Sequence, residues 1–168
     1  MDLFFVICFI GFVFISIYLV VYVDLHRKMK YSEDRVVDIF LEKISKVPAV
    51  IEVMRPHIVD DKKAFELITH LHSEAIIQVY DSIPMLMEQN AHINDQYWFL
   101  MRLSMAVPEL QKNTYFIYIR DFVMSYDRMM KSELAVFNIL VKKWNFFIKI
   151  KNWTIIGLVL PGKGKSEI

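Results

Sequence analysis

The sequence contains few of the residues that interrupt helices or cross-link a chain. Its 168 residues include one cysteine, four glycines and five prolines. A single cysteine, Cys8, excludes an intrachain disulfide and a zinc site built from cysteines. The scarcity of glycine and proline argues against a protein of strands and turns and favours long helices. We therefore expect an all-α fold.

Charge is absent from one long stretch, residues 3–23, which runs from Leu3 to Val23. At 1.5 Å per residue, a helix of this length crosses a hydrocarbon core of about 30 Å. A cleaved signal peptide would begin with basic residues, contain a shorter apolar core and end in small residues. This segment instead follows Met1-Asp2 and ends in bulky Tyr22 and Val23. We predict a transmembrane anchor at residues 3–23.

Basic side chains follow this anchor, and none precedes it. Arg27, Lys28 and Lys30 lie just after it, whereas Asp2 is the only charged side chain before it. Short flanking segments rich in lysine and arginine stay in the cytoplasm. The sequence therefore predicts a single-pass protein of the cell membrane, with its N-terminus outside and its remaining chain in the cytoplasm.

Residues 24–150 are numerous enough for one domain with its own core. Their apolar residues recur in steps of three and four, which is typical of packed helices. The first series continues in phase through Pro48, so we predict one long helix that is kinked, not ended, at Pro48 and Pro56. That series consists of Phe40, Ile44, Val47, Ile51, Met54 and Ile58.

Two middle helices follow from turn and cap signals. The acidic pair at 60–61 offers a cap for a second helix with inward residues Phe65, Ile68, Ala75 and Val79. Ser82-Ile83-Pro84 marks the start of a third helix, because proline suits the first helical turn. Residues 107–110, Val-Pro-Glu-Leu, are interpreted as a connector.

The last helix carries the clearest pattern, which only Glu133 interrupts. A seam sustained over four heptads predicts packing in a left-handed helical bundle. The seam consists of Phe116, Ile119, Val123, Tyr126, Met130, Glu133, Phe137, Leu140, Trp144 and Phe147.

Three stretches resemble motifs of the LemA family. Residues 107–122, VPELQKNTYFIYIRDF, resemble its tyrosine-proline-aspartate-leucine-lysine connector and the phenylalanine that follows it. Residues 137–145, FNILVKKWN, resemble its paired aromatic-asparagine motif. Residues 46–54, KVPAVIEVM, resemble its isoleucine-proline-asparagine-leucine-valine-glutamate segment, with alanine in place of the asparagine.

The resemblance implies a divergent LemA protein. The family's tyrosine-asparagine motif after the anchor and its phenylalanine-proline at the end of the last helix are both absent. The resemblance implies a short external N-terminus and an antiparallel up-and-down four-helix bundle. It implies no molecular activity. The lengths of the apolar series predict that the first and last helices are the long ones.

No catalytic or metal-binding constellation emerges from the sequence. Glu66 and His70, His70 and Glu74, and Glu88 and His92 lie four residues apart, so each pair shares a helix face. A di-iron bundle requires Glu-x-x-His pairs and further inward glutamates, so we interpret these pairs as surface ion pairs. Metalloprotease, phosphate-loop and nucleophile-elbow motifs are absent. We predict no enzyme, no cofactor and no metal.

Four polar residues nevertheless lie on or beside the seams. Glu133 is interpreted as a solvated position, although a polar partner or a water pocket is an alternative. Asn138 and Asn145 lie on the same flank of one helix. They either form hydrogen bonds between helices or belong to a partner-binding face. His72 is interpreted as a hydrogen-bonded core residue.

The C-terminal region, residues 151–168, combines basic and apolar residues. The apolar run from Trp153 to Leu160 is too short to cross a bilayer but can lie in its interface. Basic residues are attracted to an anionic cytoplasmic leaflet, so we expect the tail to dock on the membrane, with a tail folded onto the core as the alternative. Between Leu134 and Ser166 there is no carboxylate, and the lysines there are Lys142, Lys143, Lys149, Lys151, Lys163 and Lys165.

Two functions fit these features. The first is a membrane-tethered interaction or scaffolding module, with membrane lipid and a protein as partners and no nucleic acid. The second is an accessory subunit of a membrane-embedded assembly or transport complex, whose anchors associate through Gly11 and Ser16. These two residues are five apart, not the four that suits close helix packing, so the first function is favoured.

Overall fold

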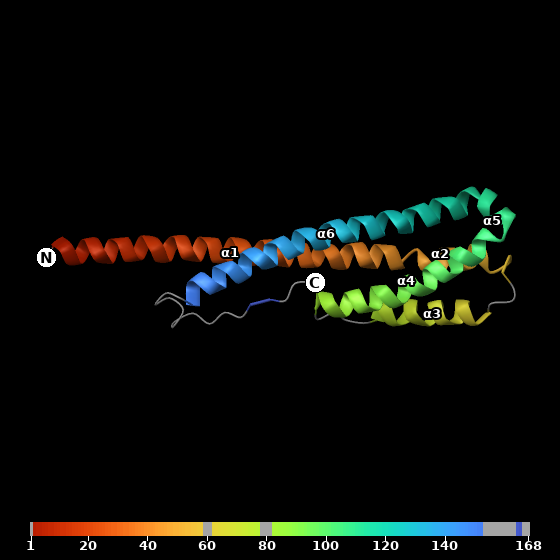
Figure 1. Cartoon of the computed structure of the whole chain (residues 1–168), viewed down its shortest axis with the longest axis horizontal. Helices are drawn as coiled ribbons and strands as arrows, with labels where there is room; N and C mark the ends of the chain where they lie inside the picture. Colours follow the sequence, from red (N-terminus) through yellow and green to blue (C-terminus); the bar gives the residue numbers. More distant parts are fainter. Residues whose placement is uncertain (1, 59–61, 78–81, 153–163, 166–168) are drawn as a thin grey trace. The chain divides into compact units, whose positions relative to one another are not determined.

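The computed structural model describes residues 2–58, 62–77, 82–152 and 164–165, and every element in these residues is a helix. The first and last helices are the longest, with 43 and 39 residues, which confirms that part of the prediction. In chain order, the helices of Figure 1 are α1 (Asp2–Ile44), α2 (Val47–Met54), α3 (Lys62–Ile77), α4 (Ile83–Met105), α5 (Pro108–Lys112) and α6 (Thr114–Asn152).

The chain forms two compact units. One contains residues 34–134 and is called the core unit here. The other contains the described residues of segments 1–33 and 135–167 and is called the terminal unit. Helices α1 and α6 contribute residues to both units.

The prediction of one kinked helix through Pro48 and Pro56 is wrong. Helix α1 ends at Ile44, and α2 begins at Val47 with Pro48 in its first turn. Proline has no N–H to donate to the carbonyl four residues earlier, so the Ile44 carbonyl loses its helical donor. Lys46 instead donates its N–H to Lys43, and α2 ends at Met54, before Pro56.

The predicted phase of this region is nevertheless confirmed. All six residues of the first apolar series are buried in the core unit. Lys46 keeps helical dihedral angles between α1 and α2, at φ −93° and ψ −12°, so the break adds little rotation to the side-chain pattern.

The starts of the later helices follow local signals. Ser82 is extended and Pro84 lies in the first turn of α4, as predicted. The predicted connector at 107–110 contains the start of α5, a helix of five residues. Asn113 caps α6, because its side-chain oxygen accepts the N–H of Phe116 at 3.0 Å. The proposed cap at 60–61 and the inward residue Val79 lie outside the described residues.

The interior of the core unit is formed by one face of each helix. Helix α3 packs beside α4 and also contacts α2 (Figure 1). The predicted inward residues Phe65, Ile68 and Ala75 are buried. Helix α4 contributes Ile83, Leu86, Asn90, Ile93, Tyr97, Leu100, Met101 and Ser104.

In the first half of the α6 seam, four of the five predicted residues are buried and Tyr126 is half-buried, and in the second half the seam drifts. Leu140 and Phe147 are half-buried, whereas Val141 and Ile148 are fully buried in their place. A straight helix has 3.6 residues per turn, so a strict 3.5-residue pattern rotates by about 20° per heptad. The buried stripe therefore moves one position along the chain by the end of the helix.

The N-terminal part of α1 differs from all other described helices. Among the described helices, this is the one that is long and apolar enough to cross a membrane. No residue of its most apolar stretch is buried. Phe4, Phe9 and Phe12 are each 69% exposed. The apolar run Trp153 to Leu160, predicted to lie at the membrane, is outside the described residues.

Candidate functional site

A charged side chain lies in the interior of the core unit. Lys43 is in the last turn of α1, and its residue exposure is 0%. It lies three residues after Phe40 and four before Val47, so it occupies a position of the apolar seam. Burial of an unpaired ammonium is costly, and this position therefore requires acceptors from neighbouring helices.

Three oxygens surround the ammonium of Lys43. Its Nζ donates to Asn90 Oδ1 at 2.8 Å, to Asn94 Oδ1 and to Asp127 Oδ1 at 2.6 Å. Asn90 and Asn94 lie one turn apart on α4, and Asp127 lies on α6. A protonated lysine has three N–H donors, so this arrangement satisfies all of them. We call these four residues the lysine cluster.

The environment of Lys43 acts on its pKa in two directions. Burial lowers the pKa because the charged form loses its hydration. The hydrogen bond and negative charge of Asp127 favour the protonated form and oppose this change in part. The net effect is a pKa below the ordinary value for lysine.

Tyr97 lies one turn beyond Asn94 on α4 and is completely buried. Its hydroxyl has no hydrogen-bond partner among the described residues. Burial raises the pKa of this hydroxyl, and the charge of Asp127 raises it further. The neutral phenol is therefore the favoured form inside the core.

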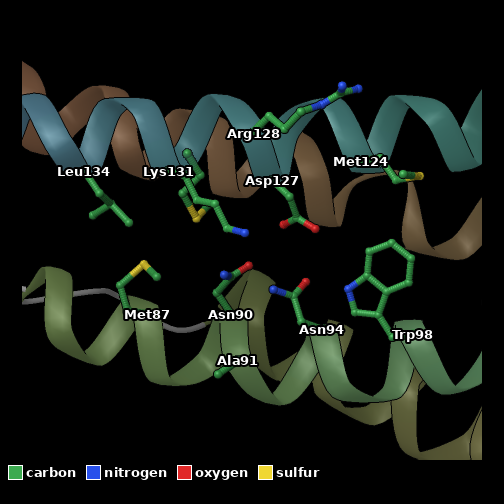
Figure 2. Close-up of a pocket in the computed structure, with 11 residues that line it drawn as sticks. Met87, Asn90, Ala91, Asn94, Trp98, Met124, Asp127, Arg128, Lys131 and Leu134 are labelled. Carbon is green, nitrogen blue, oxygen red and sulfur yellow. The ribbon is translucent and has the colours of Figure 1, made fainter.

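A cavity of about 430 Å³ borders the lysine cluster between α4 and α6. Figure 2 shows Asn90 and Asn94 of α4 pointing toward Asp127 of α6, with Trp98 beside them. The basic side chains of Arg128 and Lys131 belong to the same lining. The apolar part of the lining consists of Met87, Ala91, Trp98, Met124, Met130 and Leu134.

The lysine cluster is suited to fixing helix register. Its hydrogen bonds join α1, α4 and α6, and a shift of one residue in any of them would leave a buried charge without acceptors. All three donors of Lys43 are already used, so its ammonium has none left for a ligand. Among the described residues, no three histidine, cysteine, aspartate or glutamate side chains form a group that could hold a metal.

The polar residues singled out in the sequence, Glu133, Asn138 and Asn145, differ in their contacts. Glu133 and Asn138 are half-buried, and both have interaction partners. Asn145 bonds to the backbone of Lys165, because its amide N–H donates to the Lys165 carbonyl at 2.7 Å and its side-chain oxygen accepts the Lys165 N–H at 2.9 Å. The Lys165 ammonium in turn pairs with Glu33 in the same terminal unit.

The histidines are not brought together into a site. His70 and Glu74 form an exposed ion pair at 3.4 Å, as the sequence predicted. His72 is half-buried, with Nε2 unpaired among the described residues. Burial lowers the pKa of His72, and a hydrogen bond with the Ile44 backbone opposes this change.

The sequence interpretation missed the lysine cluster, although a signal was present. The series Val36, Phe40, Lys43, Val47 and Val50 keeps the three-four spacing, and all of its members are buried. Leu86, Asn90, Ile93 and Tyr97 form an equivalent series on α4. A lysine and an asparagine at seam positions of different helices indicate a polar contact inside the bundle.

The described residues show an all-helical protein, with one N-terminal helix that is long and apolar enough to cross a membrane. No known protein-family profile matches the chain. A search of characterised proteins likewise gives no significant match.

Among the described residues, Asp127 is the one anion that contacts Lys43, and Asp127→Ala removes it. We expect the free energy of unfolding to fall by about 3 to 5 kcal/mol, because a buried ammonium would lose its counter-charge. A urea titration of the full chain in mild detergent measures this loss. The exposed Asp121→Ala on the same helix is the control and should cost at most about 1 kcal/mol. The double variant Lys43→Met/Asp127→Leu should recover most of the loss, and no recovery would contradict this account.

Tyr97→Phe tests the unpaired hydroxyl. Above pH 10, the ordinary pKa of tyrosine, the unfolded phenol loses its proton while the buried one keeps it. The unfolded state is then favoured, so the wild-type chain loses stability as pH rises, and Tyr97→Phe should lose less. Near neutral pH the variant should be at least as stable as wild type, since no hydrogen bond is lost. Denaturant titrations near neutral pH and above pH 10 measure the free energy of unfolding of each protein. Tyr115→Phe, at an exposed tyrosine, is the control. If the free energy of unfolding depends on pH in the same way in Tyr97→Phe and wild type, the Tyr97 hydroxyl is not a buried, neutral phenol.

Proposed function

We propose that the protein is a single-pass membrane protein that holds a helical interaction module at the bilayer surface. The observation that carries this proposal is the exposure of the apolar segment of α1. An uncharged helix whose phenylalanines are mostly exposed is unfavourable in water and favourable in hydrocarbon. We assign residues 3–23 as the anchor.

The proposed orientation has the N-terminus outside and the rest of the chain in the cytoplasm. Arg27 and Lys28 follow the anchor directly and pair with Asp24 at 3.8 Å and 2.7 Å. The topological rule counts lysines and arginines and gives acidic residues little weight, so these pairs do not alter the assignment.

We further propose a divergent LemA-like arrangement, an antiparallel up-and-down four-helix bundle over residues 24–150. Its first helix would combine the end of α1 with α2, and α3, α4 and α6 would supply the others. The hydrogen bonds of Lys43 to α4 and α6 support this arrangement because they place three of these helices around one point. The family assignment itself rests on the motifs at 46–54, 107–122 and 137–145.

The proposed activity is binding of a protein partner through exposed aromatic residues of the core unit. Trp98 and Phe99 on α4 are 37% and 36% exposed, and Tyr115 and Tyr118 on α6 are 56% and 61% exposed. Aromatic side chains supply much of the binding energy in protein interfaces. We propose no catalytic activity for this module.

The accessory-subunit alternative has less support. It requires anchors that associate through small residues, but the Ser16 hydroxyl donates to Phe12 of its own helix at 2.9 Å. Gly11 lies in open space, and no second small residue is suitably spaced to extend a packing face.

Cysteine labelling tests the topology. Cys8→Ser removes the only native thiol, so single cysteines can be introduced at Asp2 and at the exposed Glu88. In intact cells, a membrane-impermeant maleimide should label Asp2→Cys but should label Glu88→Cys only after permeabilisation. The opposite pattern would reverse the topology, and recovery of the chain in the soluble fraction would contradict anchoring.

Photo-crosslinking tests the partner surface. A benzophenone amino acid in place of Tyr118 should give one discrete, heavier adduct in the cells that naturally express the protein. The same replacement at Glu88, an exposed polar position on α4, is the matched control and should give none. Adducts of equal yield at both positions, or none at Tyr118, would argue against an interface on this face of α6.

A further inference from the structure

The C-terminal part of α6 has a second apolar face besides its buried seam. Phe137, Val141, Trp144 and Ile148 are buried in the terminal unit. On the other side of the same helix, Ile139, Phe146 and Ile150 are 53%, 66% and 51% exposed. Their spacing of seven and four residues places these three side chains on one stripe of the helix surface.

Lysines border this exposed stripe. Lys142, Lys143 and Lys149 are all exposed, and residues 135–152 contain no carboxylate. A helix with apolar side chains and lysines on one surface matches the composition of helices that lie in a membrane interface. Long lysine side chains can keep the charge among headgroups while their methylenes lie along apolar surface.

Ring contacts place this stretch of α6 beside the apolar segment of α1. Trp144 lies 5.2 Å from Tyr22 and 6.1 Å from His26 between ring centroids, and Phe147 stacks on Tyr18 at 4.6 Å. Tyr18 precedes the end of the anchor at Val23 by five residues, or about 7.5 Å along a helix. The end of α6 therefore reaches the depth at which tryptophan and tyrosine gather in membranes.

We propose that this outer face of α6, formed by Ile139, Lys142, Lys143, Phe146, Lys149 and Ile150, lies in the headgroup region and binds anionic lipid. The inference rests on the proposed anchoring of α1 and adds a second membrane contact. The sequence predicted such a contact for the C-terminal region, residues 151–168, and the contact proposed here lies on helix α6 itself. The partner is a bilayer because the apolar and basic side chains share a surface that adjoins the anchor.

Depth-dependent quenching tests the proposal on the full chain. An environment-sensitive fluorophore is attached to a single cysteine, and the protein is reconstituted into vesicles that contain a lipid-borne quencher. Three positions are compared: native Cys8, Phe146→Cys in the Cys8→Ser background, and Tyr118→Cys in the same background. The vesicles contain phosphatidylcholine alone or with phosphatidylglycerol. Because Phe146 and Tyr118 are both exposed aromatic residues of α6, the second is a matched control.

Quenching at Phe146 should be several-fold greater than at Tyr118 and should increase when anionic lipid is added. Lys142→Gln/Lys143→Gln/Lys149→Gln should remove the increase, whereas Lys62→Gln/Lys63→Gln/Lys112→Gln, at exposed lysines of the core unit, should not. Strong quenching at Cys8 with none at Phe146 would overturn the inference and leave the anchor intact. Absence of quenching at Cys8 would overturn the anchoring itself. A signal at Phe146 that depends on protein density and not on the quencher would assign the face to a second copy of the chain.

Discussion

The rest of the core unit depends on the burial of one positive charge. The ammonium of Lys43 is removed from water, which costs several kcal/mol per ion unless other groups replace the lost hydration. Asn90, Asn94 and Asp127 supply those groups from two other helices. Because apolar side chains can slide past one another and this ion cannot, the cluster selects one register among several that the seams alone would allow.

A hollow that is partly open to solvent lies beside the same cluster. Asn90, Asn94 and Asp127, which converge on the ammonium of Lys43, form part of its lining between α4 and α6. The hydroxyl of Tyr97, one turn away, has no hydrogen-bond partner in the part of the chain that the structure describes. A buried polar group without a partner is unfavourable, so this end of the cluster combines a well-satisfied ion with an unsatisfied neighbour.

The terminal unit differs from the core unit because it exposes many large apolar residues besides those that it buries. Aromatic rings join the end of the apolar segment of α1 to the end of α6, while Phe146 and Ile150 remain exposed. In water such a surface would be unfavourable, and next to hydrocarbon it would be favourable. The lysines that accompany it are suited to the boundary between these two media, which links the proposed anchor and the proposed lipid contact.

The sequence by itself determined the helical class, the apolar N-terminal segment, the start of α4 beside Pro84 and most buried seam positions, because helix periodicity and proline chemistry act over a few residues. It did not determine whether Pro48 would kink a helix or end it, since that depends on how the backbone relaxes locally. Only the tertiary structure decided that Lys43 meets Asn90 and Asp127, which lie 47 and 84 residues away. It also decided that Asn145 bonds to the backbone of Lys165, 20 residues away. Such pairings depend on which helix faces come together, and that choice is made by the packing of the whole chain.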